Sequence, residues 1–250
     1  MPRIKLTLAY DGTDYSGFQL QPRDRTVQGE LERALGRIFD QPPRVHGSGR
    51  TDSGVHAMGQ VAHFDCPDDK AHVPWQRSLN SLLPDDVCVL KAEVVDDDFH
   101  SRFSARGKVY EYVLWTKYEF CLPHRRRFVW DCGPVDFDAM EEAAQVLLGE
   151  HDFSAFQNVG TVVNSTVRTI TEISRHPGVN EHEVVWRFKA NSFLKQMVRN
   201  LMGCLVACGR GRLGPDDVRR ILASKDRSEA PPTAPPQGLT LISVFYPDYL

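Results

Sequence analysis

The chain has 250 residues, of which 41% are hydrophobic and 25% are charged, and its formal net charge is −3. A chain of this length can bury a sizeable core, either as one large domain or as two smaller ones. No stretch approaches the roughly 18 consecutive apolar residues of a membrane helix, and the first residues form a strand pattern rather than a signal peptide. These features exclude a disordered or membrane-spanning chain and predict a cytoplasmic globular protein.

The charge is unevenly distributed along the chain, so that a net negative protein contains two basic segments. A net negative chain is not typical of a nucleic-acid-binding protein. Residues 184–215, however, contain six Lys or Arg and no Asp or Glu, and a second basic block follows at His124, Arg125, Arg126 and Arg127. Local basic surfaces of this kind can bind phosphate groups, although most charge runs are only solvated faces.

The first half of the chain alternates between two hydrophobic periods. A period of two predicts strands over 4–10, 44–46, 59–66 and 87–95, and a helical period predicts a helix over 26–39 and another that begins at Pro74. The resulting order, βαββαβ, is that of a ferredoxin-like unit with a four-stranded antiparallel sheet.

The second half repeats this order with insertions. The patterns predict strands over 108–115, 168–176, 181–190 and 240–246, and helices over 136–148, 192–208 and 215–223. We therefore expect an α+β fold of two ferredoxin-like (RRM-like) units, residues 1–105 and 106–250, with antiparallel sheets in a pseudo-symmetric arrangement. The expected active site lies in a cleft between the units.

The stretch from His46 to Phe64, HGSGRTDSGVHAMGQVAHF, contains four glycines around an Arg-Thr-Asp triplet. Such glycines allow unusual backbone angles or close approach to another surface, as ligand-binding loops require. Arg50 and Asp52 are two residues apart, so in extended backbone both side chains leave the same face. A glycine-rich turn with a surface ion pair is the alternative interpretation.

Read as a whole, GRTDSGVHAMGQV resembles the signature of the tRNA pseudouridine synthase A family, without a gap. In that family the aspartate is the nucleophile, which implies this role for Asp52, with Arg50 beside it. Further matches are a joint that resembles Phe-His-Ala-Arg-Phe-Ser-Ala before the strand with Tyr110, and a Phe-x-x-x-Met-Val-Arg-Asn segment that ends at Asn200. The resemblance implies that Tyr110 stacks on the target base and that Arg199 pairs with Asp52.

The resemblance also implies a substrate and an assembly. It implies isomerisation of uridine to pseudouridine at positions 38, 39 and 40 of the tRNA anticodon stem-loop, by a homodimer that needs neither a metal nor another cofactor. The reaction requires a nucleophile and a platform for the detached base, which one carboxylate, one arginine and one aromatic ring can supply. The sequence leaves open whether Asp52 attacks ribose C1′ or base C6, and whether Arg50 fills the space of the extruded base or grips a phosphate.

Two other interpretations use the same residues. A metal site could use His46, Asp52, His56, His63 and Asp65, but no helical ligand spacing supports one. A non-catalytic RRM-like RNA-binding protein would suit the predicted sheets and basic segments. That alternative does not explain an acidic residue, Asp52, on an RNA-binding surface.

Overall fold

The computed structural model describes residues 2–117 and 120–247, which form two compact units. Unit 1 comprises Met1–Arg106 and Leu241–Leu250, and unit 2 comprises Gly107–Thr240. The division after residue 106 lies next to the expected one after residue 105. The last strand differs from the expectation, because most of it belongs to unit 1 rather than to the C-terminal unit.

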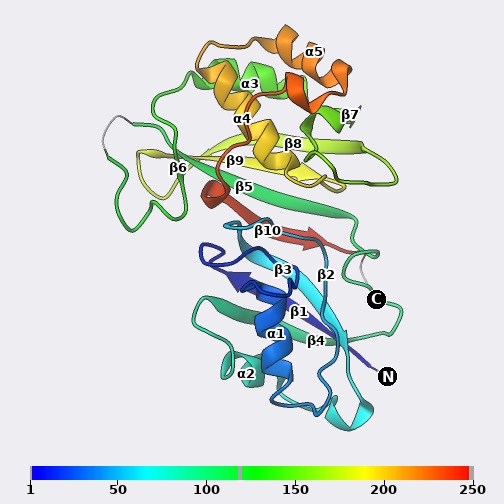
Figure 1. The fold of residues 1–250 in the computed structure, drawn as a ribbon. Coiled ribbons are helices and arrows are strands. Elements are labelled where there is room, and N and C mark those ends of the chain that lie inside the picture. The colour runs from blue at the N-terminus through cyan, green and yellow to red at the C-terminus, as the bar shows by residue number, and fades with distance from the viewer. Residues whose placement is uncertain (1, 118–119, 248–250) are drawn as a thin grey trace. The chain divides into compact units, whose positions relative to one another are not determined.

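Unit 1 contains an antiparallel sheet with two helices on one side (Figure 1). Its central strand β1 pairs with β3 on one side and with β4 on the other, while the short β2 pairs only with His63 and Ala62 of β3. The C-terminal strand β10 lies next to β3, on the side away from β1. The elements of this unit are β1 (Arg3–Tyr10), α1 (Val27–Leu35), β2 (His46–Gly47), β3 (His56–Asp65), α2 (Trp75–Asn80), β4 (Val87–Val95) and β10 (Leu239–Phe245).

Alternating side chains explain how β1 forms the centre of this unit. Ile4, Leu6, Leu8 and Tyr10 are all buried, whereas the residues between them are only partly so.

The side chain of Thr26 caps α1 by accepting a hydrogen bond from the Gly29 backbone N–H. The helix ends at Leu35, four residues earlier than predicted, in a tightened turn after Gly36. Glycine is a poor helix former, which accounts for the early end.

The main strands of unit 2 pair antiparallel in the order β5-β9-β8-β7, and the topology assigns them to the same ten-stranded sheet as the strands of unit 1. The two-residue strand β6 pairs with β5 in parallel. In Figure 1, helices α3, α4 and α5 lie together on one side of this sheet. The elements are β5 (Gly107–Trp115), β6 (Trp130–Asp131), α3 (Phe137–Gln145), β7 (Gly149–Asp152), β8 (Val167–Pro177), β9 (Glu183–Ala190), α4 (Met197–Gly209) and α5 (Pro215–Ser224).

Helix α4 begins at Met197, five residues later than the predicted start at 192. Gln196 has a φ of 61° in the left-handed region, so a right-handed helix cannot continue through it. Phe193 and Lys195 therefore lie in the loop before the helix, and the prediction that they occupy positions along it is wrong. This loop is held by a hydrogen bond from the Asn158 N–H to the Lys195 carbonyl, 3.0 Å long.

The structure confirms the mixed α+β class with mainly antiparallel strand pairing. Among the described residues, no helix is long and apolar enough to cross a membrane. The remaining helical elements are short 3-10 turns at Asp68–Lys70, Ser154–Phe156, Arg227–Glu229 and Pro236–Gly238.

Candidate active site

The glycine-rich loop of unit 1 connects β2 to β3 and carries Asp52 at its tip. Asp52 is half-buried, while Arg50 is exposed. The Asp52 carbonyl accepts a hydrogen bond from the Val55 N–H at 3.1 Å, which closes a tight turn. Within that turn Gly54 has a φ of 77°, a left-handed angle that glycine adopts without strain. The loop therefore presents one acidic side chain from a defined turn.

The residues that flank Asp52 are bonded to the segment after β1. On one side, the Thr51 carbonyl accepts a hydrogen bond from the Phe18 N–H at 3.2 Å. On the other side, the Tyr15 carbonyl accepts hydrogen bonds from the Gly54 N–H and the Ser53 hydroxyl, at 3.3 and 3.1 Å. The backbone is thus fixed both immediately before and shortly after the carboxylate.

Glycines lie where this segment packs closely against β2 and the loop. A Cβ on Gly47 would lie 2.3 Å from the Phe18 ring, and a Cβ on Gly12 would lie 2.0 Å from the Val55 carbonyl oxygen. Neither space admits a side chain. Phe18 is only 3% exposed and belongs to the core of unit 1.

A network of uncharged buried side chains lies beneath the loop. The Tyr10 hydroxyl is 2.9 Å from Thr51 Oγ1 and accepts a hydrogen bond from Gln60 Nε2 at 3.4 Å. Gln60 Nε2 also donates to the Gly49 carbonyl at 3.0 Å, and Gln60 Oε1 accepts from the Ser48 hydroxyl at 2.7 Å. Burial raises the pKa of Tyr10 to about 12, against the opposing effect of its two hydrogen bonds, so the phenol keeps its proton at neutral pH.

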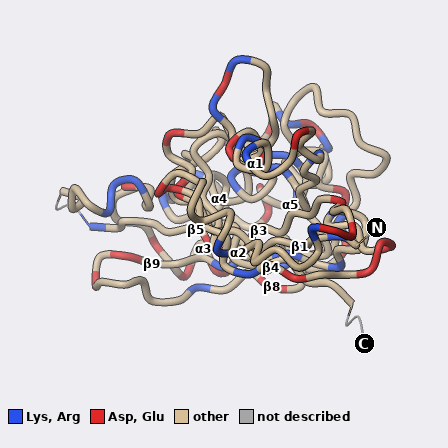
Figure 2. The backbone as a smooth tube through the Cα atoms, turned by 90° about the horizontal axis from the view of Figure 1, so that it is seen from below, with Lys and Arg blue, Asp and Glu red and all other residues tan. Residues whose placement is uncertain are grey.

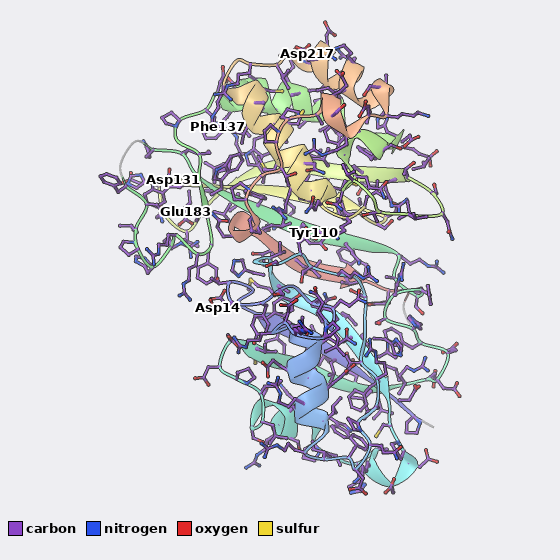
Figure 3. The ribbon with its side chains drawn as sticks, viewed as in Figure 1. Asp14, Tyr110, Asp131, Phe137, Glu183 and Asp217 are labelled. Atoms are coloured by element: carbon purple, nitrogen blue, oxygen red, sulfur yellow. The ribbon has the colours of Figure 1, made fainter. Side chains whose placement is uncertain are left out.

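Unit 2 carries the other two predicted site residues. Tyr110 lies on β5, as labelled in Figure 3, and its ring packs edge-on against Phe193 with centroids 5.3 Å apart. Arg199 lies in the first turn of α4, where its Nε donates to the Ala234 carbonyl at 2.8 Å and its own carbonyl accepts from the Ala234 N–H at 3.1 Å. The 5.3 Å contact shows that the loop before α4 supports the tyrosine.

The structure brings Arg50 and Asp52 together on one loop of unit 1, and it places Tyr110 and Arg199 within unit 2. The predicted ion pair between Asp52 and Arg199, and the predicted cleft, connect the two units and remain predictions.

The histidines considered for a metal site have other contacts. His46 and His63 stack with ring centroids 5.2 Å apart, and His63 Nδ1 lies 2.8 Å from the Ser101 hydroxyl. His56 Nδ1 accepts a hydrogen bond from the Gly12 N–H at 3.0 Å. Asp65 pairs with Arg3 at 2.7 Å. Within residues 2–117 and 120–247, no group of three or more His, Cys, Asp or Glu could hold a metal ion.

The basic segment 184–215 does not form one solvated face. Arg187 pairs with Glu111 at 2.6 Å, Arg210 donates to the Cys132 carbonyl at 2.6 Å, and Arg199 is held by Ala234 as above. Lys195 and Arg212 are exposed. Lys189 and Arg210 are exposed as well, so this segment combines surface charge with arginines that also satisfy internal acceptors.

The second basic block lies in the loop between β5 and β6. Arg125 donates to both carboxylate oxygens of Glu183, at 2.6 and 3.0 Å, and the Glu183 side chain is 1% exposed. Arg126 and Arg127 are exposed on the same loop. Figure 2 colours this run of basic residues blue along the backbone. The block thus combines one anchored arginine with two exposed ones.

Two buried polar residues that lie within the matched motifs, but had no role assigned from the sequence, organise these regions. Gln60 is 0% exposed and bonds to Ser48, Gly49 and Tyr10. Asn200 is also 0% exposed; it donates to the Phe156 carbonyl at 2.8 Å and accepts from Thr233 at 2.7 Å. A lone amide within an apolar stretch was the available signal in both cases, since a buried amide needs hydrogen-bond partners.

Comparison with known proteins gives a consistent result. A family model described as tRNA pseudouridine synthase matches residues 7–104 and 143–247. A tRNA pseudouridine synthase A of Maridesulfovibrio salexigens is 58% identical over 246 residues, covering 98% of this chain and 91% of that protein. Proteins of the same name from Solidesulfovibrio magneticus and Geobacillus kaustophilus are 56% and 43% identical, each covering 98% of this chain and 92% and 95% of their own lengths.

Proposed function

This chain belongs to the tRNA pseudouridine synthase family, and from that membership we propose that it isomerises uridines 38, 39 and 40 of the tRNA anticodon stem-loop with Asp52 as the nucleophile. The observation that carries the proposal is the half-buried carboxylate at the tip of a loop whose backbone is bonded before and after it. A nucleophile must be held in one geometry to gain from proximity, and this loop provides that.

The proposed reaction conserves all atoms of the nucleotide. The bond between ribose C1′ and base N1 breaks, the base rotates, and a bond forms between C1′ and C5, while the proton of C5 is lost and N1 gains one. Attack by the Asp52 carboxylate at ribose C1′ forms an ester with the ribose and releases the base into the site, where it must be held without a covalent bond, whereas attack at base C6 forms a covalent adduct with the base itself. No electron donor or acceptor is required by this balance.

Three further residues complete the proposed site. Tyr110 stacks on the extruded base, and its edge-on contact with Phe193 supports the ring in that role. Arg199 keeps Asp52 ionised by pairing with it, from a position that the Ala234 contact fixes. Arg50, exposed next to the nucleophile, occupies the space that the extruded base leaves or binds its phosphate.

The remaining part of the proposal concerns the substrate. We infer that cytoplasmic tRNA binds across two copies of the chain, as in the resembling family, and that the exposed Arg126 and Arg127 contact its phosphates. These contacts are independent of base identity and serve to position the RNA.

The test compares wild type with Asp52→Asn on unmodified tRNA, with pseudouridine mapped by position. We expect wild type to convert positions 38 to 40, and Asp52→Asn to lose activity by about 1,000-fold or more because an amide is not a nucleophile. Gel-shift affinity should stay unchanged. Asp69→Asn makes the same change at an exposed position of unit 1 and should remain active.

Three other outcomes would each contradict one part of the proposed function. Conversion at different positions would replace the proposed specificity, and retained turnover by Asp52→Asn would refute the nucleophile assignment. Binding of tRNA without conversion by wild type would support the non-catalytic RNA-binding alternative.

A further inference from the structure

The buried network beneath the Asp52 loop consists of neutral groups with matched partners. Tyr10 is 5% exposed, Thr51 is 5% exposed and Gln60 is 0% exposed. The Gln60 amide uses both ends: Nε2 donates to the Gly49 carbonyl and the Tyr10 hydroxyl, and Oε1 accepts from the Ser48 hydroxyl and the Val61 N–H. Buried amides with all groups paired are rigid and specific in geometry.

The direction of these hydrogen bonds follows from the chemistry. The Gln60 amide nitrogen can only donate, so the Tyr10 oxygen accepts from it and its own hydrogen is available for Thr51 Oγ1 at 2.9 Å. The raised pKa of Tyr10, about 12, keeps this hydrogen in place over the pH range in which an enzyme works. The chain of bonds therefore runs from Gln60 through Tyr10 to the residue immediately before the nucleophile.

The network connects regular structure to the loop. Tyr10 and Gln60 lie on the neighbouring strands β1 and β3, where their backbones are fixed by the sheet. Ser48, Gly49 and Thr51 belong to the loop, which has no regular structure at these positions. Side chains from rigid strands thus hold three of the four residues that precede Asp52.

We propose that Tyr10 and Gln60 are positioning residues for the reaction, which act through Thr51 to fix the Asp52 carboxylate at its attack position. This inference rests on the proposed role of Asp52 and adds that side chains of β1 and β3 hold the nucleophile in position. A displacement of the nucleophile of about 1 Å can lower a rate by about 100-fold, so loss of the network should be visible in kcat.

The first experiment separates shape from hydrogen bonding at Thr51. Thr51→Val preserves the shape and removes the hydroxyl, whereas Thr51→Ser keeps the hydroxyl and removes a methyl group. We expect kcat to fall by about 10- to 100-fold in Thr51→Val and by less than about threefold in Thr51→Ser, with KM for tRNA changed little in either. The reverse order, with Val more active than Ser, would mean that Thr51 only fills space.

The second experiment tests the connection to Tyr10. Tyr10→Phe should lower kcat to about the level of Thr51→Val, and the double variant should be no slower than either single one, because both remove the same hydrogen bond. Fully additive losses would refute the proposed path. Gln60→Met should also lower kcat while leaving the KM for tRNA nearly unchanged.

A matched control accounts for stability. Tyr246→Phe removes a phenol that donates to the Ser101 carbonyl at 2.6 Å, in the same unit but outside the network of Tyr10, Thr51 and Gln60. Its melting temperature should fall as much as that of Tyr10→Phe, while its kcat stays at the wild-type value. If the loss of kcat follows the loss of melting temperature in all these variants, the network only stabilises the fold and the proposal is wrong.

The controls distinguish this failure from failure of the proposed function. A wild-type enzyme that forms no pseudouridine, or an active Asp52→Asn variant, would contradict the proposed function. An active wild type and an inactive Asp52→Asn, together with fully active Tyr10→Phe and Thr51→Val, would contradict the positioning role alone.

Discussion

The loop that carries Asp52 and the basic loop between β5 and β6 are both irregular, but they are held in different ways. The first is bonded through neutral groups along most of its length, to Tyr15, Phe18, Tyr10 and Gln60. The second is anchored by the ion pair of Arg125 with Glu183 and exposes Arg126 and Arg127. Charged side chains face water in one loop, and backbone geometry is fixed in the other.

This difference corresponds to two physical demands. Bond formation requires placement of the attacking atom within a fraction of an ångström. Phosphate contacts act over several ångströms and tolerate flexible side chains. We therefore expect changes at fixed residues to lower the rate at saturation, and changes at exposed arginines to lower affinity.

Arg199 tests whether a residue affects the rate because its side chain is held by hydrogen bonds, rather than because it lies in the Asp52 loop. It lies in neither loop, yet its side chain and backbone are both bonded to Ala234. Arg199→Ala should lower kcat by about 100-fold and affinity for tRNA by less than about threefold, because it leaves the Asp52 carboxylate without its proposed partner. Single-turnover rates at saturating enzyme, together with filter-binding affinities, would measure both. A loss confined to affinity and its salt dependence would make Arg199 a phosphate contact.

Arg50 gives a smaller expected effect because it is exposed, although its loop is fixed. If it fills the space of the extruded base, Arg50→Ala should lower kcat by about tenfold, and Arg50→Lys should not restore it, since lysine lacks the planar guanidinium. Fluorescence of a 2-aminopurine placed beside the target uridine would report extrusion directly. Restoration of both signals by lysine would assign the residue to a phosphate instead.

The sequence predicted the elements of the fold better than the contacts of the site. The strands β1, β8 and β9 were predicted from sequence patterns, and all three are confirmed. The predicted start of α4 was wrong because Gln196 adopts a left-handed backbone angle, which the hydrophobic spacing does not reveal. The resemblance identified residues that could react, but it assigned no role to Gln60, which lies within the matched signature, or to Tyr10, and the contacts of both residues are distant in sequence.

The same limitation applies to charge. Arg125, Arg126 and Arg127 are equivalent in the sequence, and only the structure separates the anchored one from the exposed two. The partner, Glu183, is 58 residues away, at the start of β9. A basic run in a sequence therefore overestimates the number of phosphate contacts when acidic residues elsewhere can pair with it.

Replacement of both exposed arginines, Arg126 and Arg127, by alanine should weaken tRNA binding by about tenfold at moderate salt and leave kcat unchanged. The slope of log affinity against log salt should fall by roughly one unit for each lost contact. A variant with Arg23→Ala and Arg37→Ala loses the same charge at exposed positions of unit 1 and should keep the wild-type slope. Equal slopes in the two variants would show that net charge, rather than the basic loop, determines binding.

Glu183→Gln gives the smallest expected effect and the sharpest test of the anchor. The change removes one negative charge, so electrostatics alone predicts tighter binding of the polyanionic tRNA. The anchor predicts the opposite, because Gln cannot accept from both Arg125 nitrogens and the loop that presents Arg126 and Arg127 loses its fixed position. We expect affinity to fall by about three- to fivefold, with kcat unchanged.

Glu181→Gln makes the same charge change on the same hairpin, at a side chain that is 85% exposed, and should leave binding unchanged or slightly tighter. If both variants bind tRNA more tightly, the ion pair does not organise the basic loop, and the two loops differ only in charge.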